Sequence, residues 1–451
     1  MLVFFIDFQN QNWRDKKILK VIDICKRIEG HGDIKILVQN DEISLVNFEF
    51  PIYRGFENFL VGKSLLDIPK IVSRVCGLCY TSQAIASCKA IEDLYNVKVS
   101  TQTKLLRRIL MSAEMIKSHS MSFFFQTLPD LLNIFNITQK TTSPYDLINY
   151  DPKLTTNIYE LIKIGNEINN LFGSRSVHLI SLIPGAVIYS PSKKNISIAK
   201  KKFQSALISL EWIIEKFIEL FSNQTPPNEF CTPNLIYLGL SKIGNYSRYS
   251  GKLSIKENNK NMIDFEKHNY SSYFEKEPDL RGIDFHFDTK KNVIVGPISR
   301  YNIIENYGSD EIQTYIEYFD KLWKNNILFA NFIRLLEMYI ESFQSLQILD
   351  DPDLHTKQNF PSLSSIKNSD GIGVIEAPRG ILIHHYHLNK SNSIDRVKLF
   401  VATEFNIPLI NYMITNYAIM LFEKTGDINL VKNNVQRLIR AFDPCISCTT
   451  H

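Results

Sequence analysis

The stretch RVCGLCYTSQ, residues 74–83, places Cys76 and Cys79 at a CxxC spacing. A second pair with the same spacing, Cys445 and Cys448, stands close to the other end of the sequence in DPCISC. A CxxC pair puts two sulfurs on the same side of one turn, so both can reach a single ion. Two pairs supply four thiolates, a set that suits zinc, iron–sulfur, nickel or iron. If the pairs form one site, the fold must bring the ends of the chain together between long helices.

Two other interpretations compete with a shared site for nickel or iron. A CxxC pair can be a thioredoxin-like redox pair, but neither pair follows a clear strand within a βαβ unit. A structural zinc site normally has about 15–20 residues between its pairs, far fewer than separate these two. The sequence therefore favours a metal site and keeps zinc as a competitor. Arg74, Arg440 and Asp443 flank the pairs, and a nearby guanidinium favours thiolate over thiol.

The composition is that of a large globular protein with balanced charge. Of 451 residues, 44% are hydrophobic and 12% aromatic, and 51 basic residues nearly balance 47 acidic ones, so nothing points to nucleic acid. The opening MLVFFIDFQNQNW lacks the charged start of a signal peptide, and no apolar run is long enough to span a bilayer directly. We expect a cytoplasmic protein, either free or associated with a membrane through partners.

Seven cysteines, an odd count, argue against a disulfide framework. The three cysteines outside the CxxC pairs are Cys25, Cys88 and Cys231. We expect them to be small buried hydrophobic residues.

Apolar periodicity predicts a mainly helical α+β fold. DIKILVQ (33–39) and EISLVNFEF (42–50) read as strands. Apolar residues three or four apart predict long helices over 104–126, 158–172 and 203–221, and again over 310–346, 394–423 and 429–441. We expect one intertwined domain over 1–451, made of an N-terminal strand region (1–60), a helical part (61–224), a strand-and-loop excursion (225–300) and a second helical part (301–451) that ends in the metal motif.

Seven segments, in order along nearly the whole chain, resemble the large, catalytic subunit of [NiFe]-hydrogenases. They are RIEGHGDIKI (27–36), YRGFE (53–57), RVCGLC (74–79), GSRSVHLISLIPG (173–185), VGPISRYN (295–302), EAPRGILIHHY (376–386) and DPCISCTTH (443–451). The resemblance implies a centre in which nickel lies beside an iron that carries carbon monoxide and cyanide. Position by position, Cys76 and Cys445 would bind nickel terminally. Cys79 and Cys448 would bridge nickel and iron.

The implied reaction is the heterolytic cleavage of dihydrogen. By resemblance, Cys445 would take the proton, Glu29 would relay it outward, and Arg379 would lie over the open metal position. A relay role suits a carboxyl whose pKa is moved toward neutrality by burial. The resemblance also implies a magnesium or similar divalent ion at Glu57 and His451, completed by waters. Without the resemblance, Glu57 would be taken for a solvated surface carboxylate.

Electrons must also leave the centre, and the chain has no cysteines to spare for a cluster of its own. The resemblance therefore implies a heterodimer in which an iron–sulfur small subunit covers a large apolar interface. Association of such heterodimers into a higher-order oligomer is left open.

Two features depart from the usual family pattern. Gln83 stands where most members have histidine, a change that resembles that in hydrogen-sensing members and related cytosolic uptake enzymes. The sequence stops at His451, as expected of a processed chain or of one made without a C-terminal extension. Three functions remain open: a cytosolic hydrogen-uptake enzyme, a hydrogen-sensing regulatory subunit with slow turnover coupled to a signalling kinase, and a zinc-stapled structural relative.

Overall fold

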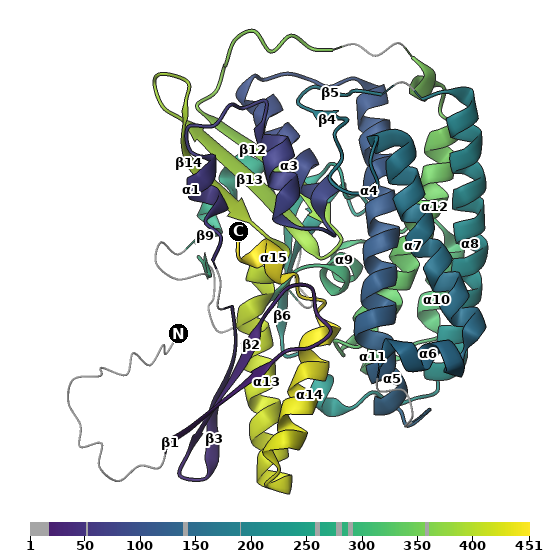
Figure 1. Ribbon diagram of the computed structural model, residues 1–451, viewed down its shortest axis with the longest axis vertical. Coiled ribbons are helices and arrows are strands. Elements are labelled where there is room, and N and C mark those ends of the chain that lie inside the picture. Colours follow the sequence, from purple (N-terminus) through teal and green to yellow (C-terminus); the bar gives the residue numbers. More distant parts are fainter. Residues whose placement is uncertain are drawn as a thin grey trace, which may run out of the picture.

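The computed structural model of the protein describes residues 18–50, 53–138, 143–189, 191–257, 262–276, 282–286, 292–356 and 360–451. The opening segment on which the signal-peptide expectation rests lies outside these residues. In Figure 1 a bundle of long helices stands beside a second part, in which small sheets pack with further helices. The C-terminal end of the chain lies within that second part, beside the segments that carry the first CxxC pair.

Four long helices form the bundle, and the apolar stripes predicted most of them. They are α4 (Thr101–Met121), α7 (Pro152–Gly173), α8 (Lys193–Phe221) and α12 (Phe329–Asp350). The helices predicted over 104–126, 158–172 and 203–221 are confirmed, with residues 122–127 continuing α4 as a π-helical turn. The side chains of Ser100, Asp151 and Ser192 accept backbone N–H groups at the starts of three of these helices, which satisfies donors that a helix leaves unpaired.

The single helix predicted over 310–346 is wrong, because the chain breaks there. Asp320 accepts the backbone N–H groups of two following residues and starts a new short helix. The break turns Phe319 and Trp323 inward, where the rings of Phe319 and Phe332 lie 4.4 Å apart. The shorter helices before and around this region are α1 (Phe56–Leu60), α2 (Ile68–Val72), α5 (Leu128–Ile134), α6 (Pro144–Tyr150), α9 (Pro297–Ile303), α10 (Asp310–Glu317) and α11 (Lys321–Lys324).

The N-terminal strands form an antiparallel sheet that packs on the C-terminal helices. Its strands are β1 (Ile18–Ile24), β2 (Asp33–Gln39) and β3 (Glu42–Glu49), and the two predicted strands are confirmed. Helix α13 (Ala402–Thr425) covers the free edge of β3, and α14 (Ile428–Ala441) packs beside it. Thr415 accepts the N–H of Val46 at 3.2 Å and donates to its carbonyl at 2.8 Å. Side chains of α13 thus pair an edge that would otherwise be open.

The region predicted as a strand-and-loop excursion contains short strands, as expected. They are β6 (Leu235–Ser241), β7 (Lys252–Glu257), β8 (Ile263–Phe265), β9 (Phe274–Lys276), β10 (Ile283–Phe285) and β11 (Asn292–Ile294), in one sheet of order β11-β6-β7-β8 and one pair β10-β9. A two-stranded pair, β4 (Leu182–Ile183) and β5 (Ala186–Val187), precedes it, and the 3-10 turns elsewhere are η3 (Asn228–Phe230), η4 (Lys267–Ser272) and η5 (Pro352–His355).

A sheet between residues 370 and 400 corrects the helical interpretation of 301–451. Its strands are β12 (Asp370–Ala377), β13 (Gly380–Leu388) and β14 (Ile394–Phe400). The helix predicted over 394–423 begins only at Ala402. The spacing of Ile394, Val397 and Leu399 fits a half-buried strand as well as a helix. Hydrogen bonding to β13 stabilises the strand. Helix α3 (Tyr80–Leu94) lies on this sheet, and a Cβ at Gly373 would stand only 1.9 Å from the Ala86 carbonyl oxygen.

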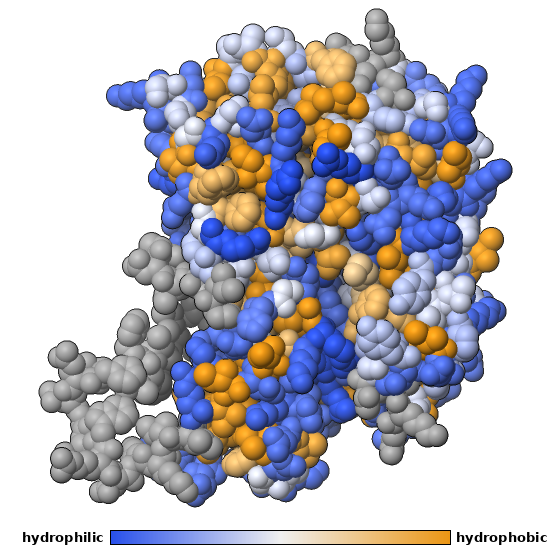
Figure 2. Space-filling view, in the orientation of Figure 1, coloured by the Kyte–Doolittle hydropathy of each residue, from blue (hydrophilic) through white to orange (hydrophobic). Residues whose placement is uncertain are grey.

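No helix in the described part of the chain is long and apolar enough to cross a membrane. Figure 2 shows that apolar residues on the face in view are interrupted by hydrophilic ones.

Candidate metal centre

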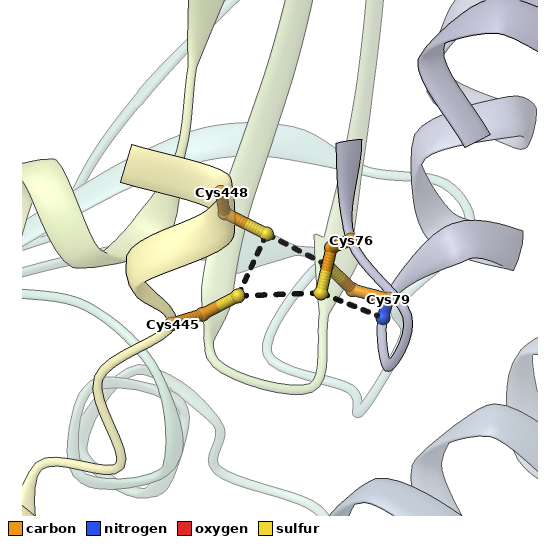
Figure 3. A group of neighbouring side chains, drawn as sticks. All are labelled: Cys76, Cys79, Cys445 and Cys448. Carbon is orange, nitrogen blue, oxygen red and sulfur yellow. Dashed lines mark hydrogen bonds between the residues drawn. The ribbon is translucent and has the colours of Figure 1, made fainter. Parts of the chain in front are cut away.

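Two short turns carry the four cysteines of the CxxC pairs. Cys76 follows the 3-10 turn η1 (Ser73–Val75), and Cys79 directly precedes α3. Cys445 directly precedes α15 (Ile446–Thr449), which contains Cys448. Figure 3 shows the side chains of the two turns pointing toward one another. All four Sγ atoms lie within 4.8 Å of one another, so the two pairs come together as predicted.

The sulfurs are close without being bonded. The Sγ atoms of Cys76 and Cys445 are 3.3 Å apart, and those of Cys79 and Cys448 are 2.8 Å apart. A disulfide bond is about 2.05 Å long, and all four thiols are free and buried. Burial raises the pKa values of Cys445 and Cys448 well above that of an ordinary thiol. Binding of a metal cation offsets this by favouring the thiolate.

This donor set fits a soft or borderline metal. It consists of four buried sulfurs, the ligands that such metals prefer. In the part of the chain that the structure describes, it is the one group of three or more His, Cys, Asp or Glu side chains that converges closely enough to hold an ion. The backbone N–H groups of Leu78 and Cys79 also point at the Cys76 sulfur, at 3.3 and 3.4 Å. These donors favour negative charge on that sulfur.

Glu29 lies against the second cysteine pair. Its Oε2 is 3.1 Å from the Cys445 Sγ and accepts the backbone N–H of Ser447 at 3.0 Å. The Ser447 hydroxyl donates to the other carboxylate oxygen at 2.5 Å. The approach depends on Gly30, whose φ of +86° suits glycine and whose Cβ would lie 2.8 Å from the Ile446 side chain. Glu29 is only half-buried, so its carboxylate connects a buried sulfur to the surface.

Arg379 lies in the turn between β12 and β13 and points toward the sulfurs. Its Nε donates to the Asp443 carbonyl and its Nη2 to the Asp443 carboxylate, both at 2.9 Å. Its Nη1 donates to the Ser118 hydroxyl at 3.3 Å. Asp443, which flanks the second cysteine pair, is thus the ion-pair partner of Arg379. The arginines that flank the cysteines in sequence play no such part: Arg74 is exposed, and Arg440 pairs with Asp130 at 2.6 Å.

A cavity of about 20 Å³ abuts three of the sulfurs. Its volume is of the order that one water molecule needs. Arg379, Gln83 and Thr403 supply its polar walls, and the remaining lining residues are Ala377, Leu382, Val401, Ala402, Cys79, Cys445 and Cys448. Cys76 does not line it, so the free space lies on the side of the other three cysteines. A wider groove of about 770 Å³ between α7 and α8 touches none of the four cysteines.

A buried chain of hydrogen bonds leads away from Cys448. The Gln83 amide nitrogen lies 3.8 Å from its sulfur, and the Gln83 amide oxygen lies 2.8 Å from Nε2 of His384. An amide oxygen only accepts, so His384 Nε2 carries the proton and Nδ1 accepts from the Tyr386 hydroxyl at 2.7 Å. Ser87 lies 3.0 Å beyond that hydroxyl. Burial lowers the pKa of His384 to about 3, so its ring is neutral at physiological pH.

Glu57 and His451, the two expected magnesium ligands, lie together. Glu57 Oε1 is 3.4 Å from His451 Nε2. The ammonium of Lys276, at the end of β9, lies 3.0 Å from Glu57 and 2.8 Å from His451. It also pairs with Glu404 at 3.1 Å. The position expected for a divalent ion is therefore next to a cationic side chain. Burial alone would raise the pKa of Glu57, but its contact with His451 and the charge of Lys276 lower it to about 2.

Comparison with known proteins decides the class to which this site belongs. A family model described as nickel-dependent hydrogenase matches residues 54–149 and 289–451, more than half of the chain. The chain belongs to this family. It is accordingly an oxidoreductase that acts on H2.

Relatives of this hydrogenase match along nearly its whole length. The beta chain of the NAD-reducing hydrogenase HoxS of Cupriavidus necator is 28% identical, over 96% of this chain and 94% of that protein. A chain of the F420-non-reducing hydrogenase vhu of Methanocaldococcus jannaschii is 26% identical, over 89% and 99%. A solved NAD+-reducing [NiFe]-hydrogenase in the H2-reduced state has the same fold, with a TM-score of 0.88 and 24% identity over 96% of this chain and 99% of that one.

Of the residues predicted from sequence, Glu29 and Arg379 join the hydrogenase cysteines in one site, whereas Glu57 and His451 form a second cluster around Lys276. Lys276 itself was missed, as were Glu404 and His384. His384 could have been found from EAPRGILIHHY. In a strand that starts at Gly380, alternate residues share one face, and His384 lies on the same face as that glycine. Lys276 lies in a stretch without periodicity, and nothing in the sequence pointed to it. Cys231, expected to be buried, is partly exposed, whereas Cys25 and Cys88 are buried as expected.

Proposed function

We propose that the protein is the catalytic subunit of a [NiFe]-hydrogenase that cleaves H2 heterolytically and passes the electrons to an iron–sulfur small subunit. The observation that carries the proposal is the convergence of four buried sulfurs from two CxxC pairs in a member of the nickel-dependent hydrogenase family. In this proposal Cys76 and Cys445 hold nickel terminally. Cys79 and Cys448 would hold nickel and iron together.

The geometry supports this division of roles. The proposed bridging sulfurs of Cys79 and Cys448 are 2.8 Å apart, and the Cys445 sulfur is 2.9 Å from that of Cys448, so these sulfurs are close enough to share a metal centre. Cys79 and Cys448 both line the cavity together with Cys445, whereas Cys76 does not. Iron would therefore lie on the cavity side. The cavity offers small apolar walls together with the donors Arg379 and Thr403, an environment suited to the carbon monoxide and cyanide expected on iron.

When bound, the metal centre would supply the site at which dihydrogen is cleaved heterolytically. The residues of the chain then handle the proton. The Cys445 sulfur accepts it, and Glu29 Oε2, 3.1 Å away, takes it on. Ser447 holds both carboxylate oxygens of Glu29 and so fixes the acceptor at that distance. Arg379, held by Asp443, keeps a fixed positive charge over the sulfurs without needing to reorganise during the reaction.

The small subunit needs an apolar surface near the centre. Residues 53–66 lie beside α15, where the Arg54 backbone N–H donates to the Thr450 carbonyl at 2.7 Å. This segment exposes the large apolar side chains of Tyr53, Phe59, Val61 and Leu66. An exposed apolar patch of this kind is typical of a contact with another protein. We place part of the small-subunit interface here.

A hydrogen sensor is the second candidate, and Gln83 is the observation that favours it. A glutamine amide can donate to the Cys448 sulfur but cannot carry a proton charge as histidine can. The two candidates share one metal centre and differ in turnover. The magnesium ion expected at Glu57 and His451 is not part of the proposed centre, because Lys276 already bonds to both side chains.

Three measurements on the purified enzyme test the proposal. Elemental analysis should find nickel and iron in equal amounts, and zinc alone would overturn it. Infrared spectra should contain bands of carbon monoxide and cyanide bound to iron. Oxidation of H2 with an artificial electron acceptor should be fast for an uptake enzyme. Slow turnover by a fully metallated sample would select the sensor instead.

A further inference from the structure

Lys276 makes all the contacts that an ammonium group can make. Its three N–H donors have three acceptors within hydrogen-bonding distance: Glu57 at 3.0 Å, Glu404 at 3.1 Å and His451 at 2.8 Å. The lysine side chain is 16% exposed, that of Glu404 5% and that of His451 1%. A nearly buried cation is tolerated only when it is paired and fully hydrogen-bonded. This group meets that condition within the chain itself.

The tautomer of His451 decides what its outer nitrogen can bind. Nδ1 lies 2.5 Å from the Cys448 carbonyl oxygen, which can only accept, so Nδ1 carries the ring proton. Nε2 is then left with a single lone pair. Lys276 donates to that lone pair. The imidazole cannot bind a metal ion through Nε2 while this hydrogen bond exists.

The Lys276 nitrogen occupies the point where a magnesium ion held by this cluster would lie. Magnesium lies at about 2.0–2.1 Å from each of its ligands, so any two ligand atoms lie within about 4.2 Å of each other. Glu57 Oε1 and Glu404 Oε1 lie 3.4 and 4.0 Å from His451 Nε2, so these distances alone do not exclude an ion. The cluster surrounds one point at hydrogen-bond distances of 2.8–3.1 Å, which is where the Lys276 nitrogen lies.

We propose that Lys276 replaces the divalent ion expected beside the metal centre and acts as a built-in cation that anchors His451. His451 is three residues from Cys448 and bonds to its carbonyl oxygen. Glu57 in turn accepts the backbone N–H of Leu399 at 2.6 Å, and Glu404 accepts that of Val401 at 3.1 Å. The ammonium thus joins α1, the start of α13 and the segment that carries Cys448. Lys276 is a positioning residue, since it touches neither the sulfurs nor the cavity.

The proposal can be tested through the magnesium content of the purified hydrogenase complex, measured per protein chain after dialysis against a chelator. Wild type should hold less than about one tenth of a magnesium ion per chain. Lys276→Met leaves two carboxylates and an imidazole around an uncharged side chain. After equilibration with millimolar magnesium it should bind about one ion per chain, and its melting temperature should rise with added magnesium, because a ligand of the native state stabilises it.

Two control variants distinguish the loss of the positive charge at residue 276 from the loss of a lysine elsewhere in the same region. Lys276→Arg keeps the positive charge and should stay free of magnesium. Lys398→Met removes a lysine that pairs with Glu275 at 3.3 Å in the same region, and its melting temperature should not respond to magnesium. One tightly bound magnesium ion per chain in wild type would overturn the proposal even if Lys276→Met fails to fold. Magnesium is counted per chain and not per nickel, so a chain without nickel would refute the proposed function and leave this result intact.

Discussion

Glu29 Oε2 lies 3.1 Å from the Sγ of Cys445, although 416 positions separate the two residues. The backbone holds them together as well, because the Ile446 N–H donates to the Glu29 carbonyl at 3.0 Å. The strand region at one end of the chain therefore supplies the only carboxylate, among the described residues, that bonds to a sulfur of the cluster.

Replacing Glu29 by glutamine should slow proton transfer and leave the metals in place. The amide preserves the shape of the side chain and can still accept the Ser447 backbone N–H while its NH2 group donates to the Ser447 hydroxyl oxygen, but it cannot accept a proton. We expect exchange between H2 and solvent protons to fall by about 10²-fold or more, with unchanged nickel and iron. Glu49→Gln, on the neighbouring sheet, is the matched control and should exchange at the wild-type rate. Loss of nickel from Glu29→Gln would contradict the relay role.

Replacing Cys445 by serine should abolish H2 oxidation. A serine hydroxyl is a harder ligand than a thiolate and stays protonated near neutral pH, so it suits nickel less well, and the proton acceptor beside Glu29 is lost with the sulfur. Nickel analysis and turnover with an artificial acceptor measure both effects. Cys231→Ser changes a half-buried cysteine outside the cluster and should retain full activity. Wild-type turnover by Cys445→Ser would remove this residue from the nickel ligands.

The CxxC spacing and the helical stripes predicted much of this architecture because both are local patterns. The proximity of Cys76 and Cys445 could be predicted because two CxxC pairs that share one metal site must lie together. The sheet over 370–400 was missed because Ile394, Val397 and Leu399 fit two periodicities, and only the neighbouring strand resolves them. Lys276 could not be predicted, since its role arises from three acceptors that lie far apart in the sequence.

The series of hydrogen bonds from Gln83 through His384 to Tyr386 should influence the metal centre, although only Gln83 contacts a cysteine sulfur. Gln83→Leu removes the amide donor at Cys448 and leaves the His384 Nε2–H buried without a partner, which costs about 1–3 kcal/mol of stability. His384→Phe frees the Gln83 amide to turn. We expect both variants to shift the infrared bands of the iron-bound ligands in the loaded enzyme.

His385→Phe is the matched control for this series of hydrogen bonds. The neighbouring ring of His385 points the other way, to Tyr270 and Asp370 at 2.7 and 2.8 Å. Its infrared bands should match those of wild type. Unshifted bands in Gln83→Leu would show that the amide does not act on the Cys448 sulfur.

Because His119 is buried, the free energy of unfolding of the protein should decrease in mild acid. Burial lowers the pKa of His119 to about 4, despite its 2.9 Å contact with Glu337, so at neutral pH the pair is a hydrogen bond from a neutral ring to a carboxylate. The unfolded chain, with a histidine pKa of about 6.5, binds the proton first as the pH falls. The free energy of unfolding should therefore decrease by up to about 1.4 kcal/mol per pH unit between pH 6.5 and 4.

His119→Gln keeps a donor to Glu337 but cannot titrate, so its urea-unfolding midpoint should fall less steeply across this window. Glu337 does not obscure the result. Burial alone would raise its pKa, but Arg300 lowers it to about 2, so its own contribution is lost only below about pH 4.5. The exposed His268 provides the control, because His268→Gln should keep the wild-type slope. Equal slopes in wild type and His119→Gln would mean that the buried ring does not set the acid sensitivity.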